Sequence, residues 1–158
     1  MISESERYQG TALRQIILSA GRPITVGVAD TSGRVDSFRI ERTGFQIKYS
    51  TKRLSPWSFS FTADQMFEVA GLARSFGSSV WMVLVCGVDG IVCLRAKEFL
   101  SITESRPGGV CSIRVYRNKN TMYRVCGNAR ELPTAKARGV DEMVSEALAQ
   151  SIQKVAAQ

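Results

Sequence analysis

Four neighbouring side chains between residues 24 and 51 have the types and spacing of a small metal and phosphate site. Asp36 lies at the start of one expected strand, and Gln46, Ile47 and Lys48 follow one another in the next. Gln46 and Lys48 should share one strand face, because successive side chains of a strand alternate between its two faces. A carboxylate beside this polar pair suits a hard divalent cation and a phosphate group. The stretch therefore predicts a compact site for phosphate chemistry.

The composition restricts the chemistry that such a site can perform. The chain contains no histidine, which excludes Ser-His-Asp and Cys-His catalysis and any histidine-based metal site. The cysteines form no Cys-x-x-Cys pair, so no zinc set is expected, and their apolar surroundings favour buried, reduced thiols. An enzyme built from this chain must use carboxylates, lysine or both. The cysteines are Cys86, Cys93, Cys111 and Cys126.

Length and composition are those of a folded single domain. The chain has 158 residues and is 44% hydrophobic, which is enough for a sizeable core. Its longest apolar runs fall short of the roughly 18 residues that a membrane span needs. The polar, acidic beginning lacks the basic-then-apolar order of a signal peptide. We therefore expect a cytoplasmic protein without a membrane partner.

Positive charge is concentrated in two separate regions. The net charge is +7; residues 1–60 contribute +4 and residues 95–138 contribute +7, whereas residues 61–94 and 139–158 contribute −2 each. Two basic regions around an apolar segment suggest surfaces that face a polyanion, DNA more readily than RNA. The candidate nucleic-acid contacts are Lys52 and Arg53 after the polar triplet, Gln65, and the basic hairpin residues Arg114, Arg117, Lys119 and Arg124.

Hydrophobic periodicity predicts an α+β fold in which the first helix and the first five strands share one sheet. Ser3 with Glu6, and Thr62 with Gln65, have the spacing of capping boxes at the starts of two helices. The expected helices are 3–19, 63–75, 96–102 and one after 139; the expected strands are 24–28, 35–41, 45–49, 57–61, 80–86, 91–94, 110–116 and 122–126.

The motif stretch resembles the core of the PD-(D/E)xK nucleases, and most closely the group I intron homing endonucleases of that type. The matching pieces are Ala29-Asp30, Val35-Asp36-Ser37-Phe38 and Phe45-Gln46-Ile47-Lys48. The resemblance covers about residues 5–95 and implies a restriction-endonuclease-like core sheet flanked by helices, a fold that archaeal Holliday-junction resolvases share. It implies one nuclease-like domain over 1–138, with an appended hairpin in 96–138, followed by a C-terminal amphipathic helix in 139–158.

The resemblance also implies roles for individual residues. Asp36 would be a metal ligand, oxygen atoms of Gln46 and Ile47 would complete the ligand set, and Lys48 would be the catalytic lysine. The implied cofactor is Mg²⁺ or Mn²⁺. Gln65 falls where several relatives carry a helix glutamine. Gln46 departs from the pattern, because it is neutral where the family has a second acid; Glu6, Asp30 or Glu41 would have to restore a carboxylate.

Each of these residues also has a purely structural interpretation. Asp36 can accept backbone hydrogen bonds after a turn, and Lys48 can be an ordinary strand lysine. Gln65 can serve only as the capping partner of Thr62. The aromatic side chains Trp57, Phe59 and Phe61 alternate along one strand, and core packing is an alternative to stacking on bases.

These observations lead to competing functions. The first is a Mg²⁺-dependent endonuclease that acts on DNA with Asp36, Gln46 and Lys48 in its site. The second keeps the nuclease fold without the chemistry, as a nucleic-acid-binding protein or a subunit of a larger nucleic-acid-associated complex. The apolar face of the final helix leaves room for a homodimer or another docking role, although such a face more often packs on its own domain.

Overall fold

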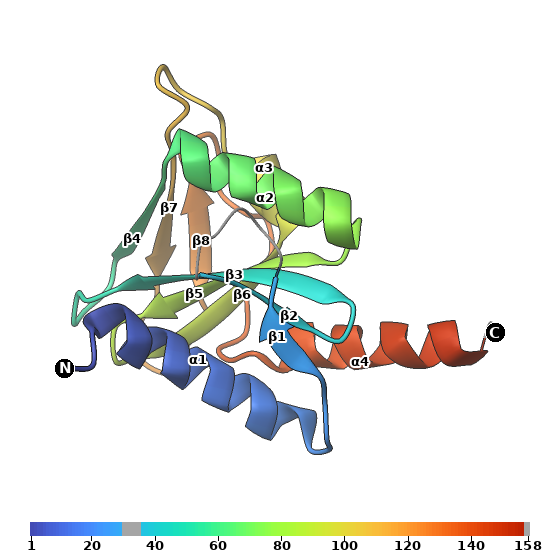
Figure 1. Ribbon diagram of the computed structural model, residues 1–158. Helices are drawn as coiled ribbons and strands as arrows, with labels where there is room; N and C mark the ends of the chain where they lie inside the picture. The colour runs from blue at the N-terminus through green and yellow to red at the C-terminus, as the bar shows by residue number, and fades with distance from the viewer. Residues whose placement is uncertain (30–35, 157–158) are drawn as a thin grey trace.

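The computed structural model describes residues 1–29 and 36–156 and contains two sheets (Figure 1). The first sheet is mixed, with the order β1-β2-β3-β5-β6. The second is antiparallel, with the order β4-β7-β8. The strands are β1 Val26–Val28, β2 Ser37–Ile40, β3 Thr43–Ser50, β4 Trp57–Phe61, β5 Val80–Cys86, β6 Gly90–Arg95, β7 Cys111–Tyr116 and β8 Arg124–Gly127; the helices are α1 Glu4–Ala20, α2 Ala63–Phe76, α3 Ala96–Ile102 and α4 Asp141–Ala156.

Strand β3 is the central strand that carries the motif. It pairs antiparallel with β2, with Ser37 opposite Gln46, and parallel with β5, with Lys48 opposite Leu84. Every residue of β5 is buried, as its continuous apolar sequence predicts for a strand covered on both faces. The motif residues of β3 are therefore held by pairing on one side to the most deeply buried strand of the fold.

Helices cover both faces of the first sheet, as Figure 1 shows: α2 lies on one side, and α1 and α4 lie on the other. The side chains of β3 point alternately to these two faces of the sheet. Phe45 and Ile47 pack in the core that contains Ile16 of α1 and Met143 of α4. The opposite face of the sheet packs against Leu72 of α2. The apolar face of α4 is thus used within its own domain.

The two helix starts follow the expected capping boxes. The Ser3 hydroxyl accepts from the Glu6 backbone N–H, and the Glu6 carboxylate accepts from the Ser3 N–H. Thr62 and Gln65 exchange the same pair of hydrogen bonds at the start of α2. Both boxes satisfy backbone donors that have no partner within the helix, so these two sequence predictions are confirmed.

The expectation that the first five strands share a sheet is wrong for β4. This strand joins the second sheet, where Trp57 lies opposite Val115 and Phe61 opposite Cys111 of β7, and β6 completes the first sheet instead. The physical reason is the alternation of β4. Trp57, Phe59 and Phe61 all face the core between the two sheets and α2, so they are core residues, and the intervening serines face outward.

The fold class is otherwise as expected. The chain is α+β, with a core sheet between helices, extra β-strands after it and a C-terminal amphipathic helix. Within the described ranges, no helix is both long and apolar enough to cross a membrane. The four cysteines are free thiols; three are buried and Cys126 is half-buried. Burial raises the pKa of Cys93 to about 12.

A group of charged side chains joins α4 to the rest of the domain, and we call it the ion-pair cluster. Lys136, only 5% exposed, contacts the carboxylates of Glu98 at 3.1 Å and Glu142 at 2.9 Å. Arg95 contacts Glu142 at 2.8 Å and Glu146 at 2.7 Å. Burial alone would raise the pKa of Glu142, but the hydrogen bonds and charges of Lys136 and Arg95 hold it below 4.5. Each charge in this cluster has an opposite charge beside it.

Candidate metal and phosphate site

One cavity brings together four of the residues that the sequence singled out. It has a volume of about 470 Å³, and Asp36, Ile47, Lys48 and Gln65 lie on its wall. These side chains come from the residue just before β2, the second half of β3 and the first turn of α2. The remaining lining residues are Ser5 and Gln9 of α1 and Tyr49, Ser50 and Thr51 at the end of β3.

Gln46 is placed differently from its neighbours. Its side chain is wholly buried and is not part of the described lining of the cavity. Its Nε2 atom donates a hydrogen bond of 3.1 Å to Oε2 of Glu68, a residue of α2 that is itself 2% exposed. Gln46 and Lys48 do share the face of β3 that looks toward α2 and β4, because Lys48 lies 5.1 Å from the ring centre of Phe61.

Three buried oxygen atoms at the β2–β3 pair lack hydrogen-bond partners among the described residues. They are Asp36 Oδ1, Ser37 Oγ and Gln46 Oε1, and we call them the oxygen cluster. Ser37 lies directly opposite Gln46, and the N–H of Ile47 donates to the backbone oxygen of Asp36 at 2.9 Å. Most buried polar atoms in proteins are hydrogen-bonded. Asp36 Oδ1 lies at the cavity, and Ser37 Oγ and Gln46 Oε1 face each other across the β2–β3 pair; each can accept from a ligand that supplies positive charge or donors.

Glu68 is the residue that the sequence analysis missed. Its carboxylate is buried against Gln46, so an acidic group lies beside the position where Gln46 replaces an acid. The signal was present in the helix periodicity. Glu68 lies four residues before the buried Leu72, and hence on the inner side of α2, where an ionisable side chain is unusual unless it has a partner.

Two of the three carboxylates expected to restore a second acid, Glu6 and Glu41, do not take that place. Glu6 is engaged in the α1 capping box, whose backbone and side-chain hydrogen bonds with Ser3 lower its pKa. Glu41 lies at the turn that ends β2, away from Asp36, and accepts a hydrogen bond of 3.2 Å from the Thr25 N–H. Asp30 lies outside the described residues. Among the described residues, Glu68 is the acidic side chain hydrogen-bonded to the motif, through Gln46.

Lys48 is held in a defined position at the cavity wall. Its ammonium group donates a hydrogen bond of 2.8 Å to the backbone oxygen of Ser60 in β4 and lies over the Phe61 ring. Gln65 has two roles, since its Oε1 accepts from the Thr62 N–H while the residue also lines the cavity. The structural interpretation of Gln65 is confirmed, and it does not remove the residue from the site.

The donor set at the oxygen cluster has a definite chemical character. Among the described residues, no group of three or more histidine, cysteine, aspartate or glutamate side chains is placed to hold a metal. The atoms present are oxygens: carboxylates of Asp36 and Glu68, the amide of Gln46 and the hydroxyl of Ser37. Hard cations such as Mg²⁺ prefer oxygen ligands and retain several waters. The donor types are thus those that such a cation prefers and not those that zinc prefers.

The candidate nucleic-acid contacts fall into two groups. Lys52, Arg53, Arg114, Lys119 and Arg124 are exposed, and Arg124 forms a surface ion pair of 3.2 Å with Glu131. The guanidinium of Arg117, in contrast, is engaged. It contacts the Asp89 carboxylate at 2.6 Å and donates to the Thr121 backbone oxygen at 2.8 Å. Arg117 therefore fastens the β7–β8 hairpin to the β5–β6 turn.

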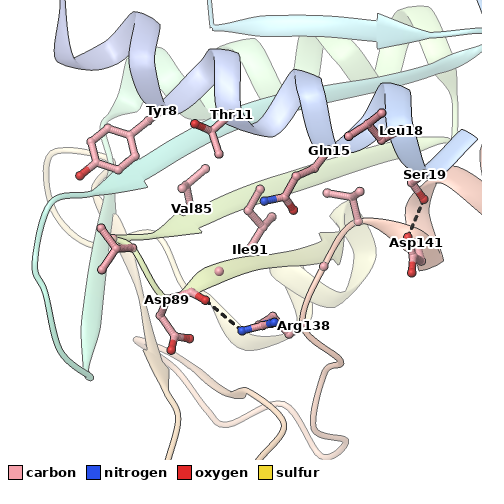
Figure 2. Close-up of a pocket in the computed structure, with 15 residues that line it drawn as sticks. Tyr8, Thr11, Gln15, Leu18, Ser19, Val85, Asp89, Ile91, Arg138 and Asp141 are labelled. Atoms are coloured by element: carbon pink, nitrogen blue, oxygen red, sulfur yellow. Dashed lines mark hydrogen bonds between the residues drawn. The ribbon is translucent and has the colours of Figure 1, made fainter. Parts of the chain in front are cut away.

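A larger cavity of about 740 Å³ lies between α1, the β5–β6 turn and the segment before α4 (Figure 2). Figure 2 shows Arg138 donating to the backbone oxygen of Asp89 and Ser19 donating to Asp141. The Asp89 carboxylate is itself bonded to Arg117 and Tyr123. These charged groups serve contacts within the fold, so the smaller cavity remains the candidate site.

Comparison with solved structures gives a likeness of fold. No protein-family model and no curated protein matches the chain. The structure is similar to that of Hjc from Archaeoglobus fulgidus, a Holliday junction resolvase from an archaeal hyperthermophile, with a TM-score of 0.49. The sequences are 14% identical, and the match covers 70% of this chain and 83% of that chain. Such a likeness concerns the fold, and the functional argument rests on the residues of this chain.

Proposed function

We propose that this protein hydrolyses phosphodiester bonds of DNA with the help of a divalent cation, Mg²⁺ or Mn²⁺, in a site of the PD-(D/E)xK type. The observation that carries the proposal is the oxygen cluster. Buried oxygens of Asp36, Ser37 and Gln46 without partners among the described residues lie at the β2–β3 pair, and the Gln46 side chain contacts the buried Glu68 carboxylate. Lys48 is two residues further along the same strand face, at the wall of an open cavity.

The negative charge for a cation comes from two elements. Asp36 at the start of β2 supplies one carboxylate, and Glu68 of α2 supplies the one that Gln46 lacks. The Gln46 amide is bonded to Glu68 through Nε2, and this orients its Oε1 as a neutral oxygen donor. When bound, a divalent cation neutralises charge that develops on the phosphate and makes a bound water more acidic. The proposed cation ligands are therefore the side-chain oxygens of Asp36, Glu68 and Gln46.

Lys48 and the residues at the end of β3 bind and position the phosphate group of the substrate. The hydrogen bond to Ser60 keeps the Lys48 ammonium at the cavity wall, where its positive charge would stabilise a phosphate group in the cavity. Ser50 and Thr51 add hydroxyl groups to the same wall, and the exposed Lys52 and Arg53 follow them in the chain. Hydroxyl and cationic groups of this kind position a nucleic-acid backbone.

The test is cleavage of plasmid, single-stranded and branched DNA by the purified protein in Mg²⁺ or Mn²⁺. The expected result is cleavage that stops on addition of EDTA and is lost in Asp36→Asn and in Glu68→Gln. Asp64→Asn is a matched control, because Asp64 is an exposed aspartate at the start of α2 outside the cavity lining. Wild-type cleavage in EDTA, or full activity of Asp36→Asn, would exclude the proposal.

A specific observation favours a second candidate, a nuclease-fold protein that binds DNA without cutting it. Glu68 Oε2 already accepts from Gln46, and the described residues contain no set of three acidic ligands. In this case no metal would support cleavage, and Asp36→Asn would bind DNA as tightly as the wild type. Charge reversal at Lys52 or Arg53 would still weaken binding and reduce its dependence on salt.

A further inference from the structure

The second sheet has two faces of opposite character. Its inner face is apolar and packs in the core through residues such as Phe59, Ile113 and Val125. Its outer face carries only short hydroxyl side chains, two arginines and one tyrosine, apart from the Cys126 thiol. We call this outer surface the serine–arginine face; it consists of Ser58, Ser60, Ser112, Arg114, Tyr116 and Arg124.

Strand pairing sets the arrangement of this face. Ser58 of β4 lies opposite Arg114 of β7, Ser60 lies opposite Ser112, and Tyr116 lies opposite Arg124 of β8. Directly opposed side chains on one face of an antiparallel pair are neighbours. Each hydroxyl therefore lies within one strand spacing of another polar group, and the arginines stand at two points across the sheet.

The serine–arginine face and the candidate site share strand β4, whose inner side chain Phe61 lies under Lys48 and whose outer serines belong to the face. Lys48 at the cavity wall donates to the backbone oxygen of Ser60, a residue of this face. At the other end of β4, the backbone N–H of Arg117 donates to the Ser55 hydroxyl at 3.1 Å. The exposed Lys52 and Arg53 thus lie on the chain between the cavity and the β7–β8 hairpin.

We propose that the serine–arginine face binds the sugar-phosphate backbone of duplex DNA beside the candidate site. The proposal rests on the proposed function and names the surface that holds its substrate. Arg114 is exposed and has no ion-pair or hydrogen-bond partner among the described residues, so its charge is available. Short serines allow a phosphate to approach the sheet, and arginine and hydroxyl groups are the usual phosphate contacts.

Duplex DNA is a better occupant than a single strand. Proteins that hold single strands usually stack successive bases on several aromatic side chains. On the described serine–arginine face Tyr116 is the sole aromatic residue, and the Arg124 guanidinium lies 4.6 Å from its ring centre. The face therefore offers charge and hydroxyl groups for phosphates but no row of stacking platforms.

The test measures binding of a short fluorescent duplex DNA of mixed sequence by anisotropy, with EDTA present so that no cleavage occurs. The variant is Arg114→Gln, and the matched control is Arg14→Gln, an exposed arginine on α1 that carries the same charge. Arg114→Gln should weaken binding and reduce the slope of log K against log salt by about 1, since one phosphate contact is lost. Arg14→Gln should bind as the wild type does.

Equal losses in the two variants, or no loss in either, would overturn the proposal. Tighter binding of the matching single strand than of the duplex would overturn it as well. Failure here is distinguishable from failure of the proposed function. Loss of cleavage in Asp36→Asn together with normal DNA binding by Arg114→Gln would support the proposed catalytic site and contradict the proposed role of the serine–arginine face. No cleavage by the wild type, together with weaker DNA binding by Arg114→Gln alone, would support the role of the face and contradict the proposed hydrolysis.

Discussion

Two polar clusters in this domain differ in how fully their members are paired. In the ion-pair cluster, Lys136 and Arg95 each lie against carboxylates of Glu98, Glu142 or Glu146 at hydrogen-bonding distance. In the oxygen cluster, the buried atoms Asp36 Oδ1, Ser37 Oγ and Gln46 Oε1 have no such partners among the described residues.

The contrast separates structural groups from functional ones. A buried polar atom without a partner costs about 1–3 kcal/mol, so a fold retains several in one place only where something else offsets the cost. In the ion-pair cluster each charge has an opposite charge of the same chain beside it, and these contacts join α4 to the rest of the domain. The atoms of the oxygen cluster have no hydrogen-bond partner among the described residues, and a bound cation would supply a positive charge beside them. Substitutions in the two clusters should therefore have opposite consequences.

The largest effect is expected on catalysis at the oxygen cluster. Asp36→Asn should lower the rate of Mg²⁺-dependent DNA cleavage at least about a hundredfold, which corresponds to about 2.7 kcal/mol of activation free energy. The free energy of unfolding should not fall, because Asp36 is half-buried and its side chain has no hydrogen bond to the described residues that the substitution would remove. Cleavage rates and denaturant unfolding of the same preparations measure both. Loss of stability together with activity would assign Asp36 to the fold.

The reverse outcome is expected in the ion-pair cluster. Lys136→Met removes the cation between Glu98 and Glu142 and should lower the free energy of unfolding by about 2–3 kcal/mol, less than for a fully buried pair because Glu142 is 42% exposed. Cleavage per folded molecule should not change. Lys97→Met removes an exposed lysine from α3 and serves as the control, with little change in either quantity.

The same cluster should respond to pH in a definite direction. The pKa of Glu142 is lowered in the folded protein, so its contribution to stability is fully present above pH 4.5, its ordinary value, and is lost as pH falls through the lower folded pKa. The difference in stability between wild type and Lys136→Met should therefore shrink below pH 4.5. Urea unfolding as a function of pH measures it; a constant difference down to pH 3 would contradict the role of Glu142.

The smallest effect compares two buried serines. Ser37→Ala removes a hydroxyl without a partner among the described residues and should leave stability unchanged or raise it by up to about 1 kcal/mol. Ser79→Ala removes a hydroxyl that is hydrogen-bonded to Thr43 at 3.1 Å and should cost about 1 kcal/mol. Thermal or denaturant unfolding distinguishes them, and equal losses would show that Ser37 has a partner.

Local features of the fold were predictable from the sequence. The two capping boxes depend on residues three apart, and the alternation of β4 and β7 depends on residues two apart, so both are visible in short stretches. The nuclease-like motif of residues 24–51 also predicted that its polar residues lie close together. One cavity is indeed lined by Asp36, Ile47 and Lys48, together with Gln65 of α2. The sheet to which β4 belongs was not predictable, because pairing with β7 joins residues far apart in the chain.

The same limit explains the errors at the site. Gln46 and Glu68 meet only because α2 docks on β3, which no local pattern reveals. Arg114 and Arg117 look equivalent in a basic hairpin, yet only the docking of the hairpin on the β5–β6 turn brings Asp89 to Arg117. Residues that share a motif could be found by spacing, whereas residues supplied by a second element required the fold.

Binding of Mn²⁺ in the absence of DNA tests the central claim most directly. Titration of the metal into wild type and Asp36→Asn, followed by electron paramagnetic resonance or calorimetry, counts the sites without requiring any activity. We predict one Mn²⁺ site per wild-type chain, competed by Mg²⁺ and absent in Asp36→Asn. No binding by the wild type, or the same binding by both proteins, would contradict the assignment of the oxygen cluster as a cation site.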